Sequence, residues 1–185
     1  MPDTPDSRLP EFEREALPHL DALLGLALRF TGGDEARSED LVQEAFLKAW
    51  RSWKSFEAGT NCRAWLMTIL RNTFINQFRR GRSRGSDVEF DEIAERATDD
   101  DLFHADPEGL VLDRIVGEEI ARAIEELPDE FRVPVVLADI EGLGYQEIAE
   151  TLEIPVGTVK SRLFRARRRL QGRLYRHAVE MGYLG

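Results

Sequence analysis

The sequence of 185 residues has little of what metal sites and disulfides require, with a single cysteine, Cys62, and three histidines. One cysteine cannot form a disulfide within the chain, which is typical of a protein from a reducing compartment such as the cytoplasm. The histidines, His19, His104 and His177, stand far apart and lack the spacing of metal ligands. The sequence therefore predicts a cytoplasmic protein without a metal or any other cofactor.

Long apolar runs are also missing. No stretch approaches the roughly 20 consecutive apolar residues that a membrane-spanning helix requires. Residues 1–12 are acidic and contain proline, and they lack the basic and apolar regions of a secretory signal. Apolar residues still make up 42% of the chain, which is enough for globular cores. We therefore expect neither membrane insertion nor secretion.

The alternating apolar and polar residues of β-strands are missing as well, and apolar residues instead recur at helical spacing. Amphipathic helices are predicted over 11–31, 35–53, 62–80, 110–126 and 130–140, followed by two helices within 145–170. Gly32 and Gly33 end the first helix, and Leu127-Pro128 separates the fourth from the fifth. Pro134 is expected in or near the first turn of the fifth helix, where its missing N–H is tolerated. The predicted fold class is all-α.

The net charge of −10 conceals three segments of alternating sign. Residues 63–84 contain six arginines and no acid, residues 87–108 contain ten acids and one arginine, and residues 156–176 contain eight lysines and arginines and no acid. Attraction to phosphate acts within about 8 Å at physiological salt, so two basic segments can bind DNA on an acidic protein. Because the acidic segment repels phosphate, we expect the isolated protein to bind DNA weakly and to need a partner.

These features predict two small helical domains joined by a flexible acidic linker. We expect a disordered tail at 1–10, a first domain at 11–82, the linker at 83–109 and a second domain at 110–178. The linker has two interpretations. It is either a solvated tether or a segment whose carboxylates mimic the phosphates of a nucleic acid.

The most informative stretch is YQEIAETLEIPVGTVKSRLFRARRRL at 145–170. A short helix with apolar Ile148 and Leu152 meets a tight turn, and a second helix carries one apolar stripe and a basic remainder. This pattern predicts a helix-turn-helix whose second helix enters a DNA major groove. Arg162 or Arg165 can donate two hydrogen bonds to guanine. The residues expected to face outward and contact DNA are Thr158, Lys160, Ser161, Arg162 and Arg165, with the Arg167-Arg168-Arg169 cluster on phosphate.

Three segments in order resemble the extracytoplasmic-function (ECF) class of bacterial RNA polymerase sigma factors. They are EDLVQEAFLKAW at 39–50, RAWLMTILRNTFINQFRR at 63–80, and the run from ELPDEFRVPVVLADIEGLGYQEIAETL through PVGTVKSRLFRARRRL. The resemblance implies a polymerase-docking helix, a helix that reads the promoter's minus-ten element, and a domain that reads the minus-thirty-five element. It favours the phosphate-mimic interpretation of the linker. One departure is Glu153, at a turn where the family often has glycine and where a positive φ would carry strain.

The resemblance also assigns residues in the first domain. Asp40, Gln43, Glu44 and Leu47 share one helix face, which by spacing alone could equally be a solvated face, and which the resemblance makes a docking face for core RNA polymerase. The loop 56–61, flanked by Phe56 and Trp65, could receive a base turned out of the duplex. The expected DNA contacts are Asn61, Arg63, Arg71, Asn72, Asn76, Arg79 and Arg80, with Gln77 as a further base-reading amide.

The sequence therefore predicts a sigma factor with no catalysis of its own, which binds core RNA polymerase and promoter DNA to initiate transcription. The stretch GTNCRAWLMTILRNTFIN further resembles the sigma-R/sigma-H-like subgroup, which answers thiol-oxidative stress under a zinc-binding anti-sigma factor. A stand-alone helix-turn-helix repressor or response-regulator output module would use only 110–176 and leave 12–80 unexplained. A nucleic-acid enzyme is disfavoured because paired carboxylates, a P-loop and metal ligands are missing.

Overall fold

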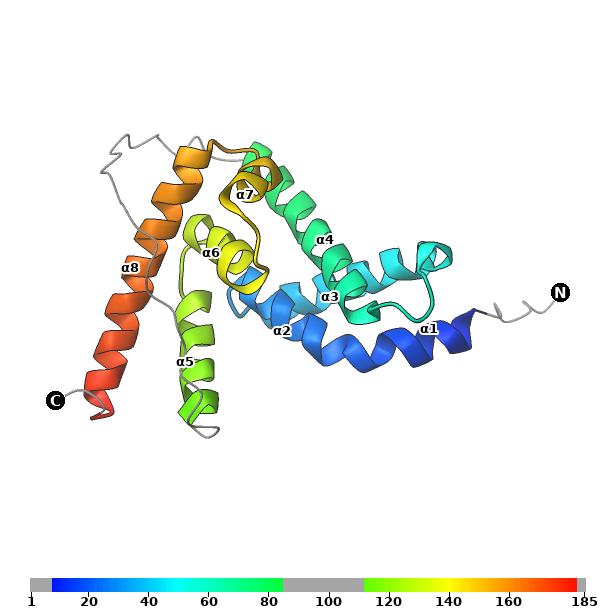
Figure 1. Ribbon diagram of the computed structural model, residues 1–185, viewed down its shortest axis with the longest axis horizontal. Helices are drawn as coiled ribbons and strands as arrows, with labels where there is room; N and C mark the ends of the chain where they lie inside the picture. Colours follow the sequence, from blue (N-terminus) through cyan, green and yellow to red (C-terminus); the bar gives the residue numbers. More distant parts are fainter. Residues whose placement is uncertain (1–7, 85–111, 183–185) are drawn as a thin grey trace. The chain divides into compact units, whose positions relative to one another are not determined.

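The computed structural model describes residues 8–84 and 112–182, and every regular element in these ranges is helical (Figure 1). This confirms the all-α prediction. The chain divides into two compact units, Met1–Ser86 and Asp87–Gly185. Most of the predicted tail and linker lies outside the described residues. Within the described ranges, no helix is long and apolar enough to cross a bilayer.

The first unit contains four helices: α1 (Leu9–Ala16), α2 (Leu20–Thr31), α3 (Glu35–Arg51) and α4 (Cys62–Arg84). Short 3-10 turns at Leu17–His19 and Trp53–Ser55 lie between them. Helix α3 packs against both α2 and α4, and α2 also contacts α4. The fully buried side chains at the centre include Leu23, Leu41 and Leu66.

The predicted single helix over 11–31 is wrong at Pro18, where the structure has a 3-10 turn. Proline lacks a backbone N–H, so an α-helix cannot run through this position without losing a hydrogen bond. The turn shifts the register of α2 relative to α1. Leu20 is 44% exposed, while Leu26 and Phe30 are buried.

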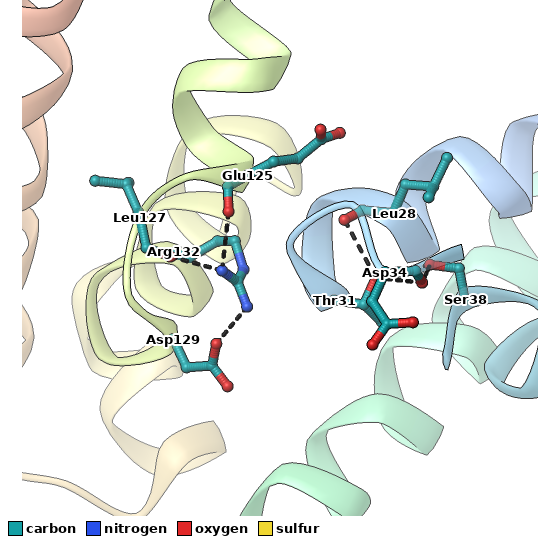
Figure 2. A network of polar contacts seen from close by, with 8 residues as sticks. All are labelled: Leu28, Thr31, Asp34, Ser38, Glu125, Leu127, Asp129 and Arg132. Carbon is teal, nitrogen blue, oxygen red and sulfur yellow. Dashed lines mark hydrogen bonds and ion pairs between the residues drawn. The ribbon is translucent and has the colours of Figure 1, made fainter. Parts of the chain in front are cut away.

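A polar corner joins α2 to α3 (Figure 2). Gly32 ends α2 in the left-handed conformation, with φ 76°, as the sequence predicts. The Asp34 carboxylate then accepts a hydrogen bond from the backbone N–H of Arg37 at 3.0 Å and caps α3. Ser38, which is fully buried, donates to the Asp34 carbonyl at 2.7 Å and lies 2.7 Å from the Thr31 hydroxyl. These contacts fix the angle at which α3 leaves α2.

The second unit contains α5 (Leu112–Glu125), α6 (Asp129–Val135), a π-helical turn (Val136–Ile140), α7 (Tyr145–Leu152) and α8 (Val156–Glu180). Pro134 is the sixth residue of α6 and not in its first turn, because the helix begins at Asp129. The predicted helix over 130–140 therefore changes type after Pro134, and the N–H of Glu141 donates to the Val136 carbonyl at 3.0 Å.

A buried arginine ties α5 to α6 (Figure 2). Arg132 is 5% exposed, and its guanidinium donates to the carbonyls of Glu125 at 3.1 Å and Leu127 at 2.6 Å. It also pairs with the Asp129 carboxylate. The carbonyls at the end of α5 lack helical partners, so this side chain takes the place of a C-terminal cap.

The helix-turn-helix prediction is confirmed in α7 and α8. Ile148, Leu152, Val159 and Leu163 are at most 1% exposed and form its core. Glu153 adopts φ 55° and ψ 49°, which is the left-handed conformation. The sequence raised this possibility, because the family often has glycine at this turn. Within residues 8–84 and 112–182 it is the one non-glycine residue with positive φ. This turn therefore carries backbone strain.

Candidate nucleic-acid interfaces and docking surface

The first turns of α8 present a basic, solvent-exposed side. Val159, Leu163 and Ala166 face the core of the second unit, which leaves the opposite side of the helix to solvent. Lys160 and Arg165 are exposed, as predicted. The other predicted contacts Thr158 and Ser161 are half-buried, Arg168 and Arg169 are exposed, and Ser161 donates its hydroxyl hydrogen to the Thr158 carbonyl at 3.1 Å.

Acids on neighbouring elements lie against four further basic side chains of α8. The pairs are Arg162–Glu130 at 3.9 Å, Arg167–Asp139 at 2.7 Å, Arg173–Glu126 at 3.1 Å and His177–Glu119 at 3.8 Å. Arg162 is thus only partly exposed, with 19% of its side chain accessible, contrary to the expectation that it faces outward. These pairs turn part of the positive charge of α8 toward its own unit.

Arg167 differs most from its predicted role in phosphate binding. Its guanidinium donates to the Asp139 carboxylate and lies 3.5 Å from the Tyr145 hydroxyl oxygen, which together raise the pKa of Arg167 further above its ordinary value. In a second pair, the hydrogen bond that Arg173 donates to Glu126 lowers the pKa of that carboxyl. Arg167 therefore connects α8 to the π-helical turn and to α7.

An open hollow of about 310 Å³ lies between α6 and α8, lined by Phe131, Arg165, Arg168 and Arg169. The guanidinium of Arg169 stacks over the Phe131 ring, with 4.5 Å between its central carbon and the ring centroid. Three guanidinium groups around one hollow suit an anionic group such as a backbone phosphate. The predicted residues Arg165, Arg168 and Arg169 are thus brought together.

Sequence reasoning missed Phe164, which is 48% exposed on α8 between Ser161 and Arg165. Its neighbour Leu163 belongs to the core. The signal available in the sequence was that 164 lies off the apolar stripe of 159, 163 and 166. An aromatic side chain exposed in this position can contact the C5-methyl group of thymine.

Helix α4 carries the predicted promoter contacts of the first unit, but they do not all share one face. Asn72, Asn76 and Arg79 lie at i, i+4 and i+7 and therefore line one side of the helix, where both asparagines are exposed. Helical spacing places Arg63 and Arg71 on other sides of α4. Arg80 is exposed and lies close enough to Glu44 to lower its pKa.

The loop before α4 is exposed from Glu57 to Asn61. Asn61, predicted to contact DNA, uses its side-chain oxygen to accept the N–H of Ala64 at 3.0 Å and so caps α4. Phe56 lies between two tryptophans, stacked on Trp53 at 4.8 Å and tilted against Trp65 at 5.1 Å. An exposed polar loop beside an aromatic wall suits an unstacked base.

The face of α3 that was predicted to dock a partner is solvent-exposed. Asp40 and Gln43 are exposed, and Leu47 is 56% exposed although it is a large apolar residue. Glu44 is half-buried, and its carboxylate accepts hydrogen bonds from Lys48 at 2.7 Å and from Gln77 at 2.7 Å. The Lys48 hydrogen bond lowers the pKa of Glu44 against the opposing effect of partial burial, and Gln77 lowers it further.

Gln77 was predicted to read bases together with Asn72 and Asn76. Its side chain does not lie on their side of α4. Its side chain is directed toward α3, about 100° around α4 from Asn76, because consecutive helical residues diverge by that angle. Its amide nitrogen donates to Glu44 instead of facing the side that carries Asn72 and Asn76. The sequence could not show this contact, because 33 residues separate the two partners.

Two family models match the chain. The model described as Sigma-70 region 2 covers residues 17–84, and the model described as Sigma-70, region 4 covers residues 117–170. The first match contains α2, α3 and α4, and the second contains most of α5, all of α6 and α7, and α8 as far as residue 170. Both the exposed α3 face and the basic start of α8 therefore fall within matched regions.

Characterised proteins resemble the chain over most of its length. The ECF RNA polymerase sigma factor SigE of Mycolicibacterium smegmatis is 37% identical over 173 residues, which is 93% of this chain and 65% of that protein. The RNA polymerase sigma-H factor of Pseudomonas aeruginosa is 34% identical over 166 residues, covering 84% of this chain and 82% of the relative. The sigma factor RpoE of Bartonella quintana, solved with the anti-sigma factor NepR, is 36% identical, covers 89% of this chain and 97% of that one, and has a TM-score of 0.49.

Proposed function

The chain belongs to the ECF sigma factors of bacterial RNA polymerase, and from this premise we propose that it directs core polymerase to a set of promoters. In this proposal residues 11–82 dock the polymerase and read the minus-ten element, and residues 110–178 read the minus-thirty-five element. The predicted linker, 83–109, joins them. The observation that carries the proposal is the presence, in order, of both sigma regions with an exposed docking face and two helices suited to DNA.

The second unit would read the upstream element with the start of α8. Lys160 and Arg165 are exposed there, and a guanidinium can donate two hydrogen bonds to one guanine. Phe164 adds an apolar contact suited to a thymine methyl group. Arg168 and Arg169, which line the hollow with Phe131, would hold a backbone phosphate. Thr158, Ser161 and Arg162 are half-buried and would contact DNA at the edge of this surface.

The first unit would open and hold the downstream element. Asn72 and Asn76 share a face of α4 with Arg79, so amide groups for base edges lie next to a cation for phosphate. The exposed loop from Glu57 to Asn61, beside Phe56, would receive one base of the separated strand. Capture of that base offsets the cost of unpairing, which is a few kcal/mol. Arg63, Arg71 and Arg80 would contribute phosphate attraction from other sides of the helix.

Docking on core polymerase would use the face of α3 with Asp40, Gln43, Glu44 and Leu47. Its exposed leucine beside carboxylates suits a basic partner surface with an apolar centre. Each DNA-binding unit is small, so its affinity alone is low. A common partner that holds both units would make their contacts add through effective concentration.

We also propose control by an anti-sigma factor in the cytoplasm. The resemblance of GTNCRAWLMTILRNTFIN at 59–76 to the thiol-stress subgroup supports a zinc-binding regulator. A regulator that covers the α3 face would prevent docking. Pull-down of the native complex from cells, with zinc analysis of the bound protein, tests this part separately from promoter recognition.

In vitro transcription with core polymerase on a genomic library, with start sites mapped, tests the central proposal. We expect the full chain to give specific initiation only together with core polymerase, and to bind the same promoters weakly alone. Tight palindromic binding by a dimer of the isolated chain would instead support a stand-alone repressor. A chain that does not associate with core polymerase would contradict the proposal.

A further inference from the structure

The side chain of Gln77 lies where two proposed functions meet. It belongs to α4, the proposed promoter helix, yet its amide nitrogen donates to Oε2 of Glu44 on α3 at 2.7 Å. Glu44 belongs to the proposed docking face. The other carboxylate oxygen, Oε1, accepts from Lys48 at 2.7 Å. Each oxygen of Glu44 thus already has one donor from within the protein.

The donors themselves are held in place. The Lys48 ammonium also donates to the Thr73 hydroxyl on α4 at 3.2 Å, and Thr73 is 1% exposed. Thr73 in turn donates to the Ile69 carbonyl at 2.8 Å, one turn earlier in α4. The carboxylate of Glu44 is therefore fixed from two directions, by a neighbour on its own helix and by a residue of α4.

Fixing a carboxylate in this way leaves it able to bind a partner. Each carboxylate oxygen has two lone pairs, so one internal donor per oxygen leaves acceptor sites for an arginine or lysine of another protein. The Glu44 side chain is 42% exposed, which gives such a group access. Because its rotamer is already set, Glu44 would lose less conformational entropy when it binds.

Resting on the proposed function, we infer that Gln77 is a positioning residue for polymerase docking. Its amide holds the Glu44 carboxylate in the orientation that α3 presents to a basic partner surface. Gln77 acts through Glu44 and does not itself touch the polymerase. This assigns a role on the docking side to a residue whose sequence position predicted base reading.

Charge supports the same arrangement. The groups that lower the pKa of Glu44 are Lys48 on α3 and Gln77 and Arg80 on α4. The hydrogen bond from Lys48 is the main cause of the lowered pKa of Glu44, with Gln77 adding to it. The side chain is therefore ionised at neutral pH, as a docking carboxylate must be.

The direct test measures the affinity of the full chain for core polymerase without DNA, for wild type and Gln77→Glu. This nearly isosteric change replaces the N–H donor by a second carboxylate beside Glu44, and we expect binding to weaken by about 10-fold, the scale of one lost hydrogen bond to a charged group. Gln146→Glu is the matched control, because Gln146 is an exposed glutamine that donates to Glu150 at 3.2 Å on α7. We expect it to change binding by less than about 2-fold, the scale of an ordinary surface substitution.

Two further measurements separate positioning from general stability. In a double-mutant cycle, adding Gln77→Ala to Glu44→Ala should cost no further affinity, because Gln77 acts through Glu44. Gln77→Lys, which keeps a hydrogen-bond donor for Glu44 at this position, should bind core polymerase with nearly wild-type affinity. Carbon-detected NMR titration should show the pKa of Glu44 rising toward its ordinary value in Gln77→Ala.

The outcomes distinguish this inference from the proposed function. If wild type does not bind core polymerase, the proposed function fails. If Glu44→Ala weakens binding but Gln77→Glu behaves like Gln146→Glu, only the positioning role of Gln77 is overturned. Additive effects of Glu44→Ala and Gln77→Ala would overturn it as well. Thermal unfolding of each variant checks that Gln77→Glu folds, and Gln77→Ala provides the same comparison without the added charge.

Discussion

Replacing Arg132 by methionine tests whether one buried guanidinium holds the second unit together. Arg132 is 5% exposed and donates to the Glu125 and Leu127 carbonyls, where α5 ends and α6 begins. Methionine keeps most of the apolar stem of arginine, so packing around it changes little. The substitution therefore isolates the loss of the charged donor.

The magnitude follows from the partners that are left behind. A hydrogen bond to a charged group contributes about 1.5–3 kcal/mol, and a buried carbonyl without a donor costs about 1–3 kcal/mol. The Leu127 carbonyl is in a buried bond, whereas the Asp129 side chain is 54% exposed and can turn to water. We expect a loss of about 3 kcal/mol in the free energy of unfolding of this unit.

The distribution of tryptophan makes the assay selective. All three tryptophans, Trp50, Trp53 and Trp65, lie in the first unit, so their fluorescence reports its unfolding, while far-ultraviolet circular dichroism reports both units. For a domain of this size, about 3 kcal/mol corresponds to a decrease in Tm of at least about 12 °C. That decrease should appear in the circular dichroism signal and leave the tryptophan transition in place.

A matched variant sets the threshold for refuting this reasoning. Arg122→Met removes an arginine whose side chain is 63% exposed and pairs with Glu119 at 2.9 Å, and exposed pairs contribute about 0–1 kcal/mol. If Arg132→Met costs no more than Arg122→Met, the buried arginine does not serve as the cap of α5. A parallel shift of the tryptophan transition would show instead that the two units unfold together.

Three further substitutions test other parts of the structure. Glu153→Gly should stabilise the second unit by about 1 kcal/mol in thermal unfolding, because glycine accepts the left-handed conformation at φ 55°; no gain over Glu153→Ala would contradict this strain. Arg165→Ala should relax base choice in the upstream promoter element by about 1–3 kcal/mol in transcription from promoter variants, and equal weakening on every sequence would point to phosphate contact instead. Leu47→Ala should leave the unfolding free energy unchanged, because the side chain is 56% exposed, but weaken core-polymerase binding by about 5-fold; unchanged affinity would exclude Leu47 from the docking face.

Periodicity predicted the helices well because most of the chain buries one stripe of each helix. The stripe of Val159, Leu163 and Ala166 is fully buried, as its spacing indicates. The errors arose at prolines. Pro18 breaks α1 from α2, and Pro134 precedes a π-helical turn, and in both cases proline removes a backbone N–H from the helical hydrogen-bond pattern. Apolar spacing alone does not register that loss.

The candidate site was predictable by residue type but not by partner. Asn61 was expected on DNA because it is a polar residue in a loop, and the structure shows it capping α4. Gln77 was expected beside Asn76, and it bonds to Glu44 on another helix. Such contacts join residues far apart in the chain, and one sequence without its fold carries no distance information between them.

The pairing of acids with α8 supports the expectation that the isolated protein binds DNA weakly. Of the eight lysines and arginines in 156–176, Arg162, Arg167 and Arg173 pair with carboxylates of their own unit, and Arg169 stacks on Phe131. The logarithm of the binding constant falls with the logarithm of salt concentration by about 0.9 per phosphate neutralised. A surface with about five cations free of carboxylate partners therefore loses affinity less steeply with salt, and starts from a lower affinity, than one with eight. Such a unit contributes base choice to a complex rather than the strength of attachment. Under the proposed function, attachment comes from the proposed docking face of α3, and this separation of tasks leads us to expect that neither unit finds promoters without the polymerase.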